Sequence, residues 1–304
     1  MRLSAWLVGA ACVAAGLGST GCGVKLLSLE EEVALGAEAA PQLTQEYGGA
    51  VNDSRLAASI ERVGRSMTDT LDGEFRDLPW EFTLLNSPVI NAFALPGGKV
   101  FVSRALVERM TNEAQLAGVL GHEIGHVTAR HGNQKISASL IAQGVVIGAT
   151  VAASGSDNEL IQAGVPLLVS AGSGTFLLSY GRGQELESDR LGIDYMTRVG
   201  YNPIGMRQVM EILAEASQGN SPPEFFSTHP HPESRIEQID AMLGGEYAYT
   251  QFNPEFGVFE ARFDEQFLSP LNRIPQPQAR LNLLEPATWC ATCAQMEPVA
   301  LGVR

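Results

Sequence analysis

The chain has 304 residues, of which 34 are acidic and 20 basic, giving a formal net charge of −14. A polyanion of this kind is not attracted to nucleic acid or to an anionic membrane surface, which argues against both as direct partners. Hydrophobic residues make up 45% of the chain, enough for the full core of one large domain or of two small ones.

The first 21 residues have the pattern of an export signal. Arg2 supplies a positive charge, residues 3–17 are apolar and rich in Ala and Gly, and small residues then lead to Cys22. The apolar stretch is too short for a comfortable membrane span. Ser-Thr-Gly-Cys at 19–22 resembles the bacterial lipobox, whose Cys is acylated and becomes the mature N-terminus, although its first position, usually Leu, is Ser here. We expect lipidation at Cys22, with ordinary cleavage near the same place as the alternative. In both cases the protein leaves the cytoplasm.

The N-terminal third of the chain predicts two helices, a strand and a hairpin. A capping box at Ser28 opens the first helix, and Asp53 caps the second, whose apolar residues recur at helical spacing. Residues 80–84 alternate between apolar and more polar side chains, which predicts a strand. Residues 89–103 hold two extended apolar runs around a Pro-Gly-Gly turn, which predicts a hairpin.

Most of the remaining chain is helical by its pattern. Predicted helices run from Asn112 to about Arg130, from about Gln184 to Gly200, from Asn202 to about Ser217, and from Pro232 to Gly244. Residues 136–153 carry no charge, and we interpret them as a buried, glycine-rich helix, with a membrane span as the alternative. Residues 251–304 are rich in Pro, Asn and Gln and show little periodicity, which indicates a loop-rich extension that either wraps the domain or stays mobile.

The strongest chemical signal is His122-Glu123-Ile124-Gly125-His126, an HExxH pattern inside the helix that follows Asn112. Residues four apart in a helix differ by only about 40° in direction, so both imidazoles project from one face. Two nitrogens so placed can reach one zinc ion at roughly 2.0–2.1 Å. Zinc lowers the pKa of a water molecule to about 7, and Glu123 stands where it can take that proton. We expect His122 and His126 to be zinc ligands and Glu123 to be the general base.

A catalytic zinc site needs a third protein ligand and keeps its fourth position open. One class of zinc peptidase supplies a third His from an extended motif, but Ala129 and Gly132 stand at the two positions that this motif requires. His131 lies five residues after His126 and would point to a different face of the helix, so we interpret it as structural.

The later segment Glu185-Leu-Glu-Ser-Asp189 offers a carboxylate as the third ligand. Glu185 and Asp189 share one face of the predicted helix at i, i+4. Glu185 would bind zinc, and Asp189 would hydrogen-bond the outer nitrogen of a ligand His and so fix its tautomer. Taken alone, the pentapeptide fits a solvated acidic helix face equally well, and the upstream HExxH favours the metal site.

Two further segments could serve the same site. A strand shortly before the active-site helix, at Asn91, Ala92, Phe93 and Ala94, can offer unpaired backbone groups to an extended peptide, with an ordinary hairpin as the alternative. His229 lies between Thr228 and Pro230, in a stretch that two prolines stiffen. It could hydrogen-bond the developing oxyanion or occupy the open position of zinc in a resting state, or it is a capping or surface His.

Cys290 and Cys293 form a Trp-Cys-x-x-Cys motif near the end of the chain. Redox catalysis by such a pair requires a βαβ setting that lowers the pKa of one thiol. The pattern here gives no sign of that setting, so we expect a short-range disulfide formed in an oxidising compartment.

Together these motifs resemble a known family. Residues Asn91–Gly98, Leu116–Gly121 and the HExxH resemble the HtpX-like and CAAX-prenyl-protease-like zinc metallopeptidases of peptidase family M48, in their soluble exported bacterial branch. Glu185-x-x-x-Asp189 matches the third-ligand motif of that family, with Ser188 where Ala is usual. Thr228-His229-Pro230, followed by Arg235-Ile236, matches a further landmark of it.

The resemblance covers about residues 28–245 and implies an α+β, mostly α-helical fold. This is a gluzincin-type zinc metallopeptidase domain with a small β-sheet whose exposed edge receives substrate. It also implies a likeness to periplasmic proteases that degrade misfolded outer-membrane proteins.

We therefore predict a signal peptide over residues 1–21, a metallopeptidase domain over 22–250 with one zinc ion per chain, and an extension of unknown role over 251–304. The predicted function is endoproteolysis of misfolded or misassembled envelope proteins in the periplasm, with a lipid anchor in the outer membrane. One alternative is a chaperone-like protein that retains the metal site, against which the intact Glu123 argues. The other is a thiol-redox protein acting through Cys290 and Cys293.

Overall fold

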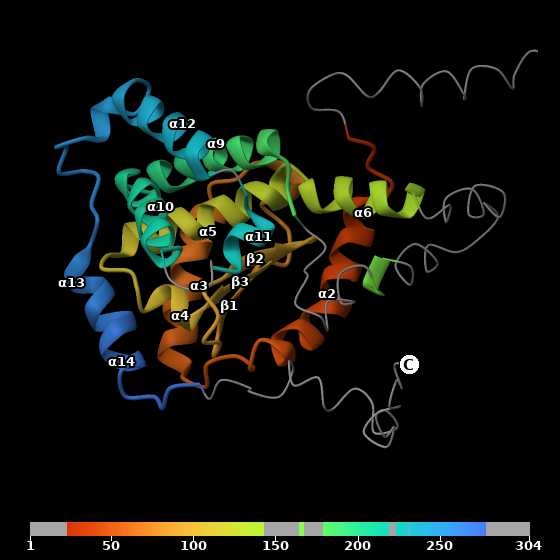
Figure 1. The fold of residues 1–304 in the computed structure, drawn as a ribbon, viewed down its shortest axis with the longest axis horizontal. Helices are drawn as coiled ribbons and strands as arrows, with labels where there is room; N and C mark the ends of the chain where they lie inside the picture. Colours follow the sequence, from red (N-terminus) through yellow and green to blue (C-terminus); the bar gives the residue numbers. More distant parts are fainter. Residues whose placement is uncertain (1–22, 143–163, 167–178, 219–222, 231, 278–304) are drawn as a thin grey trace, which may run out of the picture.

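The computed structural model describes residues 23–142, 164–166, 179–218, 223–230 and 232–277. Within these residues the fold is α+β and mostly helical, which confirms the predicted fold class (Figure 1). The main helices are α2 (Leu29–Glu46), α3 (Ser54–Thr68), α4 (Arg104–Val107), α5 (Glu113–Thr128), α6 (His131–Ala142), α9 (Arg182–Arg198), α10 (Ile204–Ala216), α11 (Phe225–Thr228), α12 (Pro232–Gly244), α13 (Glu260–Phe263) and α14 (Ser269–Leu271). The strands are β1 (Glu81–Leu85), β2 (Ala92–Leu95) and β3 (Lys99–Ser103).

Three helices begin at the capping residues that the sequence predicts. Ser28 accepts a hydrogen bond on its side chain from the backbone N–H three residues on, at 3.2 Å, at the start of α2. Asp53 does the same at the start of α3, and Asn112 at the start of α5. Each cap satisfies an N–H group that has no partner inside its helix. The local sequence therefore determines where α5, the helix with the HExxH motif, begins.

The three strands form one sheet in the order β1-β3-β2. β2 and β3 are the predicted antiparallel hairpin, and β1 pairs with β3 in parallel, which leaves β2 at an edge. At the turn, Gly97 and Gly98 have positive φ angles of 80° and 95°, a conformation that favours glycine. A Cβ on Gly97 would also lie 2.4 Å from the Cα of Val33 on α2, so the turn packs directly on that helix.

The edge strand β2 is enclosed by helices on both of its faces, and all four of its residues are buried. Ala92 and Ala94 belong to the large hydrophobic core, which α3, α5 and α10 also line. Phe93 and Leu95 belong to a smaller core with residues of α2 and α6. This alternation is the two-residue period of a strand, and it places β2 between the two cores.

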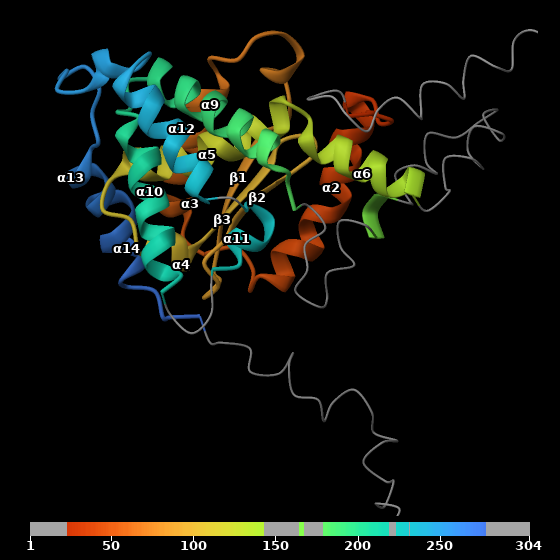
Figure 2. The same ribbon diagram turned by 45° about the horizontal axis from the view of Figure 1, so that its top comes forward.

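Helix α5 runs through the middle of the molecule, with the sheet on one side and α9, α10 and α12 on the other (Figure 2). All of its residues from Glu113 to Val127 are buried. Small residues allow α5 and α9 to approach closely: a Cβ on Gly121 would lie 3.0 Å from the carbonyl oxygen of Gly192, and a Cβ on Gly125 would lie 2.9 Å from that of Ser188. The acidic pentapeptide on α9 is thereby brought against the HExxH on α5.

The core continues past the predicted domain boundary at residue 250. Phe263, Phe267 and Leu271 are fully buried in the large core, at a spacing of four residues in a row of short helical segments. Arg104 fixes the backbone at the end of this segment, because its guanidinium donates hydrogen bonds to the backbone carbonyls of Leu271, Ile274 and Pro275. The part of the extension that the structure describes, up to residue 277, is thus packed on the domain.

Several predictions concern residues outside the described ranges. These are the signal peptide, Cys22, most of the uncharged segment at 136–153, and the end of the chain with Cys290 and Cys293. Residues 136–142 of the uncharged segment are described, and they belong to α6.

Within the described ranges, none of the helices combines the length and the apolar character that crossing a membrane requires.

The close approach of α5 and α9 can be tested with Gly192→Ala. The added Cβ would lie 2.7 Å from the backbone nitrogen of His122, so the two helices must separate. We expect this overpacking to lower the free energy of unfolding by about 1–3 kcal/mol, measured by urea denaturation followed by circular dichroism. Gly183→Ala on the same helix is the control, since no atom lies within 4 Å of its added Cβ. It should leave stability unchanged or raise it by up to about 1 kcal/mol. Equal losses in the two variants would contradict the proposed constraint.

Candidate metal centre

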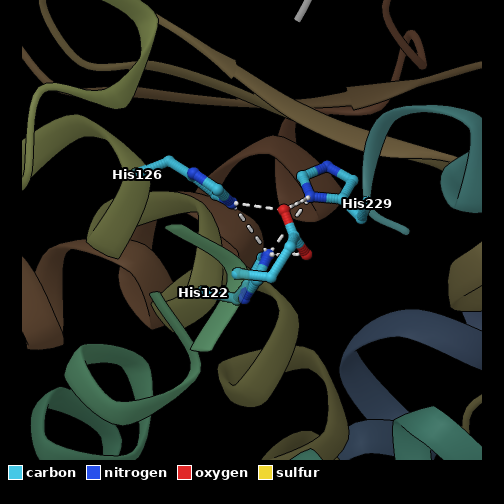
Figure 3. Close-up of side chains that lie close together, drawn as sticks. His122, His126 and His229 are labelled. Carbon is cyan, nitrogen blue, oxygen red and sulfur yellow. Dashed lines mark hydrogen bonds and ion pairs between the residues drawn. The ribbon is translucent and has the colours of Figure 1, made fainter. Parts of the chain in front are cut away.

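Four side chains from three parts of the chain converge on one point. His122 and His126 project from one face of α5, and their Nε2 atoms lie 3.0 Å apart. His229, just after α11, places its Nδ1 3.2 Å from the Nε2 of His122, and the three rings point toward one another (Figure 3). Glu185 of α9 adds a carboxylate oxygen 3.3 Å from the Nε2 of His126. The four ligand atoms all lie within 4.8 Å of one another, and all four residues are buried.

The chemistry of these groups fits a zinc ion. Two imidazole nitrogens and one carboxylate are one of the known donor sets of catalytic zinc sites. Glu123 lies beside them, and neither of its carboxylate oxygens has a hydrogen-bond partner among the described residues, although both are buried. A buried carboxylate without partners is costly, and a metal ion with water at this point would satisfy it. Burial raises the pKa of Glu123, which moves it toward the range of a general base.

Asp189 and Arg235 contact the metal ligands His122 and Glu185 and fix their orientation. The Nδ1–H of His122 donates to Asp189 at 2.8 Å, which leaves the Nε2 of that ring free for a metal. The guanidinium of Arg235 donates two hydrogen bonds to Asp189, each 2.7 Å long, and its Nη1 lies 2.9 Å from Glu185. Burial alone would raise the pKa of Asp189 and of Glu185. The charge of Arg235 on Asp189, and those of His229 and Arg235 on Glu185, outweigh it, so both pKa values lie below their ordinary range.

The comparisons with known proteins agree with this geometry. Residues 54–243 match the profile of peptidase family M48. The chain belongs to peptidase family M48. It is 36% identical over 218 residues to the beta-barrel assembly-enhancing protease of Escherichia coli, a match that covers 69% of this chain and 43% of that protein. It is 30% identical over 223 residues to the mitochondrial metalloendopeptidase OMA1 of Schizosaccharomyces pombe, covering 71% of this chain and 62% of that one.

The family resemblance predicted from the motifs is therefore confirmed. M48 metallopeptidases depend on zinc, and the cluster of His122, His126, Glu185 and His229 is able to hold a metal ion, which confirms the predicted cofactor. The chain spans less than half the length of the bacterial relatives it matches.

The sequence argument placed one residue beside the metal centre incorrectly. His131 was expected to point away from the two ligands, but its Nδ1 lies 2.9 Å from the Nδ1 of His126. The spacing argument assumed one continuous helix. The backbone instead leaves α5 at Arg130, which has a positive φ of 59°, and α6 begins at His131 in a new direction. A left-handed Arg has no signature in the local sequence.

Two other residues of the site had no role in the residue-level prediction. Arg235 entered only through the family landmark, because a single Arg in a helix pattern usually faces solvent. Tyr180 stacks on the ring of His126 with the centroids 3.8 Å apart, and it is buried. Its contact depends on a loop conformation that periodicity cannot predict.

The segment around α11 covers the metal centre and lies against the start of β2. The backbone N–H of Tyr180 donates to the carbonyl of Thr228, next to His229, at 3.0 Å. Asn91, the first of the predicted substrate-binding residues, donates from its side-chain amide to Glu224 at 3.0 Å. The N–H of Phe225 donates to the carbonyl of Ile90 at 3.3 Å. The structure thus joins the His229 segment to the predicted substrate strand.

Proposed function

We propose that this chain is a zinc-dependent endopeptidase that cleaves misfolded or misassembled proteins of the cell envelope. The observation that supports the activity most strongly is the convergence of His122, His126 and Glu185 beside the buried carboxylate of Glu123, whose oxygens accept no hydrogen bond from the described residues. The printed name of the bacterial relatives, beta-barrel assembly-enhancing protease, supports the class of substrate.

Each side chain has a distinct task in this reaction. A bound zinc ion supplies Lewis acidity, which polarises the scissile carbonyl and lowers the pKa of a water molecule to about 7. His122 and His126 present their Nε2 atoms to the metal, because their Nδ1 atoms are engaged by Asp189 and His131. Glu123 takes the proton from the attacking water and passes it to the leaving amine.

We propose that His229 would hold a bound metal ion as a fourth protein ligand in this conformation. Its Nδ1 lies 3.2 Å both from the Nε2 of His122 and from Glu185. Its Nε2 faces Glu123 at 3.5 Å. This arrangement favours the resting-state role over the oxyanion role. A hydrogen bond from His229 to an oxyanion requires the α11 segment to move away from the metal.

We propose that the outer edge of β2 binds an extended substrate. Hydrogen-bonded pairs alternate along an antiparallel ladder, and the carbonyl of Asn91 accepts from Ser103 on β3. The backbone groups of Ala92 and Ala94 therefore point away from β3. A small cavity beside this strand is lined by Ala94 together with Tyr180 and His126. Main-chain pairing at this edge accepts any sequence, which suits a protease for misfolded proteins.

The alternatives have less support. A chaperone-like protein does not require Glu123 at the metal centre, whereas a peptidase does. A thiol-redox role depends on Cys290 and Cys293, which lie outside the described residues.

The proposed activity is tested with Glu123→Gln, which keeps the size of the side chain but cannot take up a proton. We expect this variant to retain zinc and to digest unfolded casein at least about 10²-fold more slowly than the unchanged chain. Glu211→Gln, at an exposed carboxylate on α10, is the matched control and should digest normally. Normal digestion by Glu123→Gln would show that Glu123 is not the general base. Loss of zinc from this variant would indicate that Glu123 is a metal ligand instead.

We also propose export and acylation at Cys22, which anchors the chain to the outer membrane. The described chain begins one residue later and is fixed to α6: the N–H of Leu26 donates to Ser137 at 2.8 Å, and the carbonyl of Leu27 accepts from Asn133 at 2.7 Å. Four residues of extended chain span at most about 14 Å. An acyl group on Cys22 would therefore hold α6, and with it this end of the peptidase domain, close to the membrane surface.

Acylation is tested by labelling expressing bacterial cells with radioactive palmitate. We expect the unchanged chain and Cys12→Ser to incorporate label, because Cys12 lies inside the signal that is removed. Cys22→Ser should incorporate none and remain soluble after cell fractionation. Label in Cys22→Ser equal to that in the unchanged chain would rule out this anchor.

A further inference from the structure

We propose that His131 and Glu187 are positioning residues for the metal ligand His126. They form a hydrogen-bond relay that fixes the tautomer of His126, as Asp189 does for His122. The inference rests on the proposed metal centre, because the relay has a purpose only if the Nε2 of His126 binds a metal.

The contacts of the relay lie within one small region of α5, α6 and α9. The Nδ1 atoms of His126 and His131 are 2.9 Å apart, and the ring centroids are 5.0 Å apart. The Nε2 of His131 lies 3.3 Å from a carboxylate oxygen of Glu187. His131 is buried, whereas the side chain of Glu187 is 51% exposed. The relay therefore runs from the metal ligand to the solvent-exposed rim of α9.

The protons of this relay have a single consistent arrangement. If the Nε2 of His126 offers its lone pair to a metal, then its Nδ1 carries the proton and donates. The Nδ1 of His131 must accept that hydrogen bond, so a neutral His131 carries its own proton on Nε2. This Nε2–H then donates to the carboxylate of Glu187. A metal bound to His126 requires the proton of His126 on Nδ1 and that of His131 on Nε2. The carboxylate of Glu187, at the other end of the relay, favours the same two tautomers.

Arg130 turns His131 toward the ligand. Its positive φ of 59° separates α5 from α6, so that the ring of His131 returns to the face of α5 that bears His126. The guanidinium of Arg130 is held by Glu32 of α2, with Nε donating at 2.6 Å. The left-handed conformation at Arg130 is therefore supported by a contact with a buried carboxylate.

The supports of the two ligands differ in strength. Asp189 is buried and carries a charge that Arg235 stabilises, so His122 is held by a fixed ionic partner. His126 is held by a neutral imidazole, whose own partner is half exposed to water. Helix α9 supplies a residue to each part of this arrangement: Glu185 for the metal, Asp189 for His122 and Glu187 for His131.

The proposal is tested by measuring zinc affinity through competition with a chromophoric chelator. Outer partners of ligand histidines typically contribute 10–100-fold to metal affinity, so His131→Leu, which fills the space but accepts no hydrogen bond, should weaken zinc binding by about that factor. His131→Asn places an acceptor oxygen near the position of Nδ1 and should restore most of the affinity. Glu187→Ala should weaken binding less than His131→Leu, and Glu187→Gln, which keeps an acceptor, less still.

Thermal unfolding of the zinc-free chain separates positioning from packing. We expect His131→Leu to unfold at the temperature of the unchanged chain without zinc and to differ only when zinc is present. Asp194→Ala, at a partly exposed carboxylate on α9, the helix of Glu187, should behave as the unchanged chain in both assays. If His131→Leu does not fold, the contrast between Glu187→Ala and Glu187→Gln decides the question.

Two results would overturn the relay: His131→Leu binding zinc as tightly as the unchanged chain, or Leu and Asn at this position weakening binding equally. Identical zinc affinities of Glu187→Ala and Glu187→Gln would show that Glu187 is not part of the relay. An unchanged chain that binds no zinc would contradict the metal centre itself, which is a distinguishable failure.

Discussion

The approach of α9 to α5 is the contact on which the metal centre depends. The HExxH supplies two imidazoles from one helix, but the third ligand Glu185, the partner Asp189 of His122 and the partner Glu187 of His131 come from α9. At Gly121 and Gly192 the two backbones lie so close together that a side chain on either residue would collide with the other helix. This distance places the acidic pentapeptide within hydrogen-bond reach of the histidines. A larger separation would take Glu185 and Asp189 out of reach of His126 and His122.

Charge balance explains why these groups tolerate burial. Three buried carboxylates, Glu123, Glu185 and Asp189, face one permanent cation among the described residues around them, Arg235. Three negative charges against one positive charge leave two negative charges, which a dication would neutralise. Burial alone lowers the pKa of His229, but the charges of Glu185 and Glu123 outweigh it and raise that pKa. A ring nitrogen that carries a proton cannot bind a metal ion, so a bound metal would take the place of that proton on His229.

The sequence predicted those parts of the site that depend on regular helices. His122, His126, Glu185 and Asp189 lie at i, i+4 spacings, and the structure brings them together because that spacing is preserved within each helix. His131 was placed incorrectly because one left-handed residue redirects the chain. Tyr180 and the cover over β2 depend on loop contacts between distant segments, and Phe263, Phe267 and Leu271 were overlooked because three separate short elements carry them. The tertiary arrangement of irregular segments has no local pattern from which to predict it.

The central claim is that one zinc ion is held by His122, His126 and Glu185, and metal analysis of the purified chain tests it most directly. We expect one zinc per chain by plasma mass spectrometry in the unchanged protein and in Asp194→Ala, whose carboxylate lies on α9 away from the site. Glu185→Ala should lose the metal, because two imidazoles alone do not retain it. Absence of zinc from the unchanged protein, or full zinc content in Glu185→Ala, would contradict the account.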